Sequence, residues 1–178
     1  KQLTYFIGEE NFRKGIQNYL KKFYGENTVL DDFLNCMSKS SGINIIEWSK
    51  KWLETTGVNT LKLCGGNNKW NIKQTPSENN DQIRNHAIMY ESYKIEGKKV
   101  VLNKKNKIII SEENTKFDFE EMGDFVLLNA QDHDYVKIHF RENDLHFIYN
   151  YLNDINDRFT KRIIWGNLWQ MVRDNVLS

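Results

Sequence analysis

Residues 44–73, NIIEWSKKWLETTGVNTLKLCGGNNKWNIK, combine two hydrophobic periods without a linker between them. The first half places Trp48 and Trp52 one helical turn apart and offers Asn44 as an N-cap. The second half alternates apolar and polar residues around a Gly-Gly-Asn-Asn turn, which predicts a β-hairpin. The period changes at Gly57, which we expect at the C′ position of the helix. The stretch therefore predicts a helical layer that passes directly into a β layer.

The residues before this stretch also have a helical period. Apolar side chains recur at three- and four-residue steps in residues 12–23 and 30–37, which predicts two amphipathic helices. Thr28 and Asp31 are expected to form a capping box for the second of them. Residues 1–7 are typical of the second half of a helix, so we expect that the chain is cut from a longer one.

The middle of the chain is typical of short strands. After the hairpin, strands are expected at residues 83–94, 99–102, 107–111, 116–119, 125–128 and 135–140. No crossover helices separate them, which favours antiparallel pairing in a β-sandwich. A helical period returns after Phe140, with Trp165 and Trp169 one turn apart. The predicted fold class is α+β, with a helical segment (1–57), an antiparallel β-sandwich (58–140) and helices (141–178).

Composition excludes several classes of partner. The 178 residues contain 25 Lys and Arg against 24 Asp and Glu, so the formal charge is +1 and no basic footprint for nucleic acid is present. No apolar run approaches the roughly 18 residues of a membrane span. Cys36 and Cys64 are expected to be reduced, buried thiols, and the predicted localisation is cytoplasmic. We expect neither a nucleic-acid nor a membrane partner.

The histidines do not predict an active site. None of His86, His133, His139 and His146 is followed by Glu, so the zinc motif HExxH is absent. His133 lies in Asp-His-Asp, which we interpret as a polar turn leading into a strand, and His139 and His146 are expected to face solvent. Gly65-Gly66 lacks the Lys of a phosphate-binding loop and is expected in the hairpin turn. The sequence thus predicts no catalytic, cofactor-binding or metal-binding residue.

Several motifs nevertheless occur in a characteristic order. They are Gly8-Glu9-x-x-Phe12-x-x-Gly15, Tyr24-Gly25-x-Asn27-Thr28, residues 52–61 (WLETTGVNTL), Ile83-Arg84-Asn85-His86, residues 124–140 (DFVLLNAQDHDYVKIHF) and residues 163–175 (IIWGNLWQMVRDN). This series resembles the aminopeptidase N family of zinc metallo-aminopeptidases of the gluzincin type. Asn85 departs from the family pattern, which has a proline at that position.

The resemblance implies a domain assignment and a function. Residues 1–57 would be the helical end of a thermolysin-like catalytic domain, residues 58–140 the β-sandwich domain, and residues 141–178 the start of a C-terminal helical domain. The parent would use zinc to remove N-terminal residues from peptides, with its zinc ligands upstream of Lys1. This segment would be inactive and metal-free by itself, and would make intramolecular contacts with the catalytic and C-terminal helical domains.

The residues also allow a second function. Because they contain no catalytic constellation, the chain could instead be a stand-alone, non-catalytic binding module built on the β-sandwich. The coding sequence upstream of Lys1 distinguishes the two hypotheses, since an HExxH motif there supports the enzyme.

Overall fold

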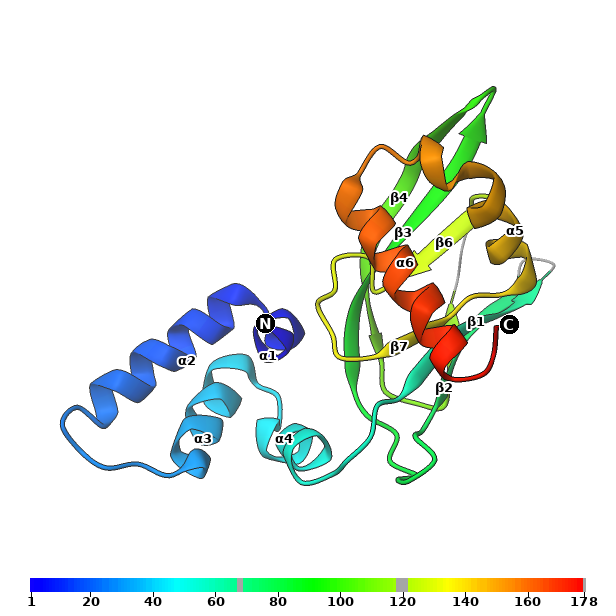
Figure 1. The fold of residues 1–178 in the computed structure, drawn as a ribbon. Coiled ribbons are helices and arrows are strands. Elements are labelled where there is room, and N and C mark those ends of the chain that lie inside the picture. Colours follow the sequence, from blue (N-terminus) through cyan, green and yellow to red (C-terminus); the bar gives the residue numbers. More distant parts are fainter. Residues whose placement is uncertain (67–68, 118–121, 178) are drawn as a thin grey trace. The chain divides into compact units, whose positions relative to one another are not determined.

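The computed structural model describes residues 1–66, 69–117 and 122–177, which fold into helices and two β-sheets (Figure 1). The chain divides into two compact units, Lys1–Gly57 and Val58–Ser178. The division falls where the hydrophobic period of the sequence changes. None of the helices in the described ranges has the length and apolar character needed to cross a membrane.

The first unit is helical. Its elements are α1 (Gln2–Ile7), α2 (Glu9–Lys22), α3 (Leu30–Ser41) and α4 (Ile45–Leu53). Helices α2 and α3 pack together at Gly15, where an added Cβ would lie 2.7 Å from Met37 Sδ and 2.8 Å from Ser40 Oγ. Gly15 therefore provides the small surface that this close approach requires.

The ends of these helices differ in part from the predictions. The predicted capping box of Thr28 and Asp31 is wrong by one residue. The residues that occupy these positions are Val29 and Asp32, and the Asp32 carboxylate accepts the Val29 N–H at 3.1 Å. Thr28 Oγ1 instead lies 2.5 Å from the Tyr19 hydroxyl. The predicted Asn44 cap is confirmed, and its side chain accepts the backbone N–H of Glu47 at 3.2 Å.

Gly57 is not the residue that ends α4. The helix ends at Leu53 with Glu54 as its C-cap, so Gly57 lies beyond the expected C′ position. Its φ of 85° is nevertheless in the region that favours glycine. Within this unit Trp48 is buried, and its ring lies 5.8 Å from Phe6 and 5.9 Å from Trp52 between centroids.

The second unit contains two sheets. The first has the order β5-β2-β1-β7, built from β1 (Thr60–Gly66), β2 (Lys69–Thr75), β5 (Asn114–Phe117) and β7 (Lys137–His139). The second has the order β4-β3-β6, built from β3 (His86–Glu96), β4 (Lys99–Ile110) and β6 (Phe125–Leu128). The predicted hairpin is confirmed as β1–β2, in which Leu63 lies opposite Ile72. Residues 67–68 of its turn lie outside the described residues.

The strand predictions differ from the structure in several places. β3 begins at His86 rather than at residue 83 and ends at Glu96 rather than at residue 94. β1 and β7 are parallel, with Thr60 opposite Lys137, because the intervening chain is long enough to return β7 in that direction. The strands predicted at 99–102 and 107–111 are one strand, β4, which pairs with β3 along its length. β7 is shorter than the predicted strand 135–140. Residues 118–119 of another predicted strand lie outside the described part of the chain.

The sheets and the C-terminal helices share one hydrophobic core. Helices α5 (Glu142–Tyr151) and α6 (Arg158–Arg173), separated by the short 3₁₀ helix Leu152–Asp154, lie beside β6 and β7 respectively (Figure 1). Phe125 of β6 stacks on Phe147 of α5 with 4.9 Å between ring centroids. Ile164 of α6 is completely buried in the same cluster. The structure thus confirms the predicted α+β class, with helices, two sheets and further helices in chain order.

Two glycines in this unit have opposite surroundings. A Cβ on Gly123 would lie 2.1 Å from the backbone oxygen of Tyr93, which cannot move without disturbing β3. Gly166 lies exposed in α6, and no described atom would lie within 4 Å of its added Cβ.

We expect Gly123→Ala to lower the free energy of unfolding by at least about 1–3 kcal/mol through overpacking. Gly166→Ala should raise it by about 0.5–1 kcal/mol, because alanine is the better helix former. Urea unfolding of both variants and the wild type measures the difference. Equal effects of the same sign would contradict the packing described at Gly123.

Candidate functional site

The histidines lie on separate elements. His86 of β3 is buried, with Nδ1 3.4 Å from Asp134 Oδ2. His146 is exposed on α5, as predicted. In residues 1–66, 69–117 and 122–177, no three His, Cys, Asp or Glu side chains gather in a way that could hold a metal ion. The described donors therefore do not fit a zinc centre.

The Asp-His-Asp sequence forms a structural turn. Asn129 Oδ1 accepts the backbone N–H of His133 at 3.1 Å and that of Asp134 at 3.2 Å. Asp134 Oδ2 in turn accepts the Ala87 N–H at 2.8 Å, which ties the turn to β3. The interpretation of His133 as part of a polar turn is confirmed. The strand that follows begins at Lys137 rather than at Tyr135.

His139 does not face open solvent as expected. Its side chain is 18% exposed, and Nε2 lies 3.4 Å from Asp174 Oδ2 at the end of α6. Lys137 Nζ donates to the same carboxylate at 2.8 Å, and Gln170 Nε2 donates at 2.9 Å. Desolvation alone would raise the pKa of Asp174, but these three hydrogen bonds outweigh it and hold the pKa below its usual value. These contacts of Asp174 connect β7 to the C-terminal end of α6.

Both cysteines are free thiols, and the predicted burial is confirmed for one of them. Cys36 of α3 is buried, whereas Cys64 of β1 is only half-buried, so the prediction for Cys64 was wrong.

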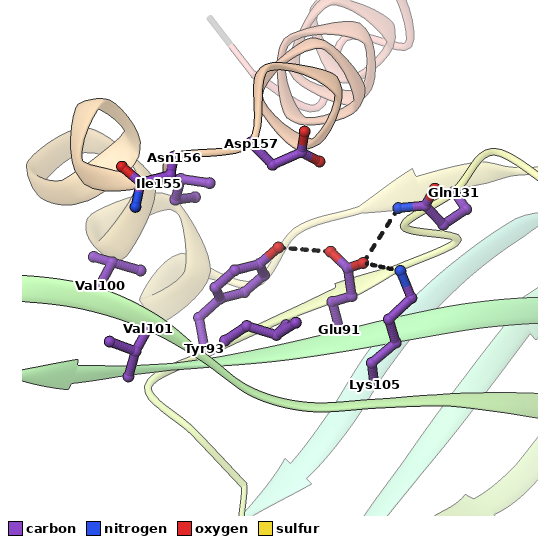
Figure 2. A pocket seen from close by; sticks show the side chains of 10 residues that line it. Glu91, Tyr93, Val100, Val101, Lys105, Gln131, Ile155, Asn156 and Asp157 are labelled. Carbon is purple, nitrogen blue, oxygen red and sulfur yellow. Dashed lines mark hydrogen bonds and ion pairs between the residues drawn. The ribbon is translucent and has the colours of Figure 1, made fainter.

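The candidate site is a cavity of about 440 Å³ lined by β3, β4 and the segment before α6 (Figure 2). The central polar residue of the cavity is Glu91, which is 3% exposed. Glu91 Oε2 accepts the Tyr93 hydroxyl at 2.6 Å, and Oε1 lies 2.9 Å from Lys105 Nζ. Gln131 Nε2 donates to Oε1 at 3.3 Å. Three donors from three segments of the chain thus converge on one buried carboxylate.

A second carboxylate lines the same cavity. Asp157 caps α6 by accepting the backbone N–H groups of Phe159 and Thr160 at 3.1 and 3.0 Å. Its Oδ2 also accepts the Thr160 hydroxyl at 2.8 Å. These hydrogen bonds, with the Thr160 hydroxyl first, hold the pKa of Asp157 below its usual value, and the Lys105 charge adds to the effect. Asp157 is therefore ionised at neutral pH.

Tyr93 is held in the opposite state. Burial raises the pKa of its hydroxyl well above the usual value, and the hydrogen bond to Glu91 raises it further. Tyr93 therefore acts as a hydrogen-bond donor at neutral pH. The arrangement of carboxylates, one ammonium and neutral donors is suited to polar recognition. Among the described residues that line the cavity, none is a Ser, Cys or His.

Sequence reasoning did not identify this site. Its polar residues come from four segments that are distant in the sequence, and only the fold brings them together. One local signal was available, because Glu91 and Ser92 interrupt an apolar run in β3, HAIMYESYKIE. A charge in such a strand requires a buried partner.

A second hollow lies between α5 and α6 and is mostly apolar. Its volume is about 370 Å³, and its lining includes Leu145, Ile148, Leu152 and Trp165. Trp165 and Trp169 are 62% and 65% exposed.

The comparisons with known proteins agree on one class. Residues 1–52 match the Peptidase family M1 domain. The whole chain is 29% identical to Aminopeptidase N of Streptomyces lividans and spans 23% of that protein. A puromycin-sensitive aminopeptidase of Caenorhabditis elegans is 35% identical over 39% of the chain, which covers 8% of that protein.

A solved structure has the same fold. The crystal structure of Legionella pneumophila aminopeptidase A in complex with aspartic acid matches 97% of this chain with a TM-score of 0.69 and 18% identity. The match covers 20% of that protein's chain. Together these similarities confirm the resemblance to the aminopeptidase N family: the chain is similar to a segment of an M1 aminopeptidase.

The hydrogen bond between Tyr93 and Glu91 yields a prediction about stability. Tyr93→Phe removes a donor to a buried carboxylate and should lower the free energy of unfolding by about 1.5–3 kcal/mol. Tyr135→Phe is the matched control, because Tyr135 is 66% exposed, and its effect should be near zero. Urea unfolding measures both. Equal effects would show that the Tyr93 hydroxyl does not support Glu91.

The Asp174 cluster yields a pH dependence. The folded pKa lies below the ordinary value of 3.8, so the stabilisation is complete above that value and is lost as pH falls through the folded pKa. Asp174→Asn should therefore cost about 1 kcal/mol at about pH 7 and little at about pH 2. The exposed Asp154→Asn serves as the control and should show no such difference. A cost that persists undiminished in acid would contradict the ionic role of Asp174.

Proposed function

We propose that this chain is a non-catalytic part of a zinc-dependent aminopeptidase that removes N-terminal residues from peptides. In this proposal residues 1–57 form the helical end of a thermolysin-like catalytic domain, and residues 58–140 form a β-sandwich domain. Residues 141–178 begin a C-terminal helical domain. The zinc ligands and the peptide site belong to another part of the parent protein.

One observation carries the proposal. The match to the Peptidase family M1 domain ends at residue 52, whereas the similarity to the S. lividans Aminopeptidase N continues through all of the chain. The compact units divide at Gly57, only a few residues beyond the end of the domain match. This coincidence is what a chain containing the end of one domain and the start of the next would produce.

The physical role of the chain in this proposal is mechanical support. Its two sheets and the helices α5 and α6 share a continuous core, which makes the unit a rigid support. The apolar side chains of Trp165 and Trp169 remain exposed on α6, and large exposed apolar patches mark interaction surfaces. We assign them to intramolecular contacts with the rest of the C-terminal helical domain.

We further propose a cytoplasmic location. Both cysteines are free thiols, which is compatible with a reducing compartment.

A chimera tests the proposal. The chain replaces the aligned segment of S. lividans Aminopeptidase N, and hydrolysis of an aminoacyl anilide is measured together with the zinc content. We expect zinc-dependent turnover, and we expect it to fall when the inserted segment carries Gly123→Ala. A chimera that folds and binds zinc but has no activity would contradict the proposal.

The chain by itself provides the complementary measurement. We expect the purified 178-residue chain to hydrolyse no aminoacyl anilide and to bind no stoichiometric zinc. Turnover abolished by His133→Ala or His139→Ala would show that the chain is itself an enzyme, and the proposal would be wrong.

A further inference from the structure

The cavity beside Glu91 presents two opposite charges with unused hydrogen-bonding capacity. The ammonium of Lys105 has three donors, and the ion pair with Glu91 at 2.9 Å occupies one of them. The carboxylate of Asp157 accepts from Phe159 and Thr160 and, having about four acceptor positions, can accept once more. A ligand in the cavity could therefore bind both groups.

Glu91, in contrast, is already satisfied by the protein. Its two oxygens accept from Tyr93, Lys105 and Gln131. The hydroxyl of Thr160 has a single proton, and its 2.8 Å contact with Asp157 is shorter than its 3.3 Å contact with Glu91. The Glu91 charge is thus balanced by Lys105, and its role is to hold the lysine at the cavity.

Apolar side chains form much of the remaining lining, together with the polar residues Gln131 and Asn156. Val100 and Ile155 are 8% and 2% exposed, whereas Leu102 is 52% exposed at the rim. Figure 2 shows Lys105 and Asp157 on different elements, with Glu91 and Tyr93 between them. The volume of about 440 Å³ lies within the range of small-molecule sites, roughly 300–1,000 Å³.

We propose that this cavity binds a free amino acid with an apolar side chain. The carboxylate of the ligand pairs with Lys105, its ammonium group pairs with Asp157, and its side chain packs against Val100, Leu102 and Ile155. A zwitterion can form a charged hydrogen bond with both Lys105 and Asp157, whereas a simple amine or a simple acid can form one with only one of them. The inference depends on the cavity alone and does not rest on the proposed function.

Three ligands with the same side chain test the proposal by isothermal titration calorimetry. Leucine carries both charges, 3-methylbutylamine lacks the carboxylate, and 4-methylpentanoate lacks the ammonium group. We expect leucine to bind and each analogue to bind at least about tenfold more weakly, because each loses a charged hydrogen bond. Absence of leucine binding, or an analogue that binds as tightly as leucine, would overturn the proposal.

Two variants assign each charge to its residue. Asp157→Asn keeps a good N-cap for α6 but removes the negative charge. It should weaken leucine binding at least about tenfold and leave the weak binding of 4-methylpentanoate unchanged. Lys105→Gln should weaken leucine binding by a similar factor and leave the binding of 3-methylbutylamine unchanged.

Matched controls separate these effects from changes in folding. Lys99→Gln is the control for Lys105→Gln, because it removes a positive charge at an exposed position of β4. Asp154→Asn is the control for Asp157→Asn, because it removes a negative charge outside the cavity lining. Neither should alter leucine binding. If Asp157→Asn or Lys105→Gln weakens the binding of all three ligands equally, the assignment of the ligand's ammonium group to Asp157 and of its carboxylate to Lys105 is wrong.

Discussion

The second unit depends on the packing around Phe125. This side chain is completely buried, and its ring lies 6.0 Å from Tyr93, 6.0 Å from Phe140 and 4.9 Å from Phe147 between centroids. It therefore connects β3, the end of the β7 segment and α5 in one aromatic cluster. Tyr93 extends this cluster to the cavity, because its ring stacks on Phe125 while its hydroxyl donates to Glu91. The rigidity of the polar site thus derives from the apolar core beside it.

A buried polar network explains why two of the family-like motifs occur together. Arg84, which is 1% exposed, donates to the side chain of Asn59. Gln74 Oε1 accepts the Arg84 backbone N–H at 2.8 Å and the Asn59 amide at 2.6 Å. Burial lowers the pKa of Arg84, and the hydrogen bond from its guanidinium to Asn59 offsets part of the desolvation cost. The network joins the start of β1, the end of β2 and the entry to β3.

The histidines and the polar groups of the cavity occupy different places in the second unit. Histidines are the usual signal for metal chemistry, but two of them pair with single carboxylates here. His86 lies against Asp134, and His139 lies against Asp174. The polar groups that line the cavity beside Glu91 are instead carboxylates, a lysine, a tyrosine and two amides. His86 and His139 therefore have structural contacts away from that cavity.

Local sequence determined the types of most elements and the family resemblance. Helical spacing, the Asn44 cap and the Gly-Gly-Asn-Asn turn act over a few residues, so helices and the β1–β2 hairpin were predictable. The alternation of side chains did not reveal that β7 pairs parallel with β1, or that β4 is one continuous strand, because strand pairing depends on partners far along the chain. The convergence of Glu91, Lys105, Gln131 and Asp157 also arises only in three dimensions. Residues so distant in sequence contact one another only in the folded chain.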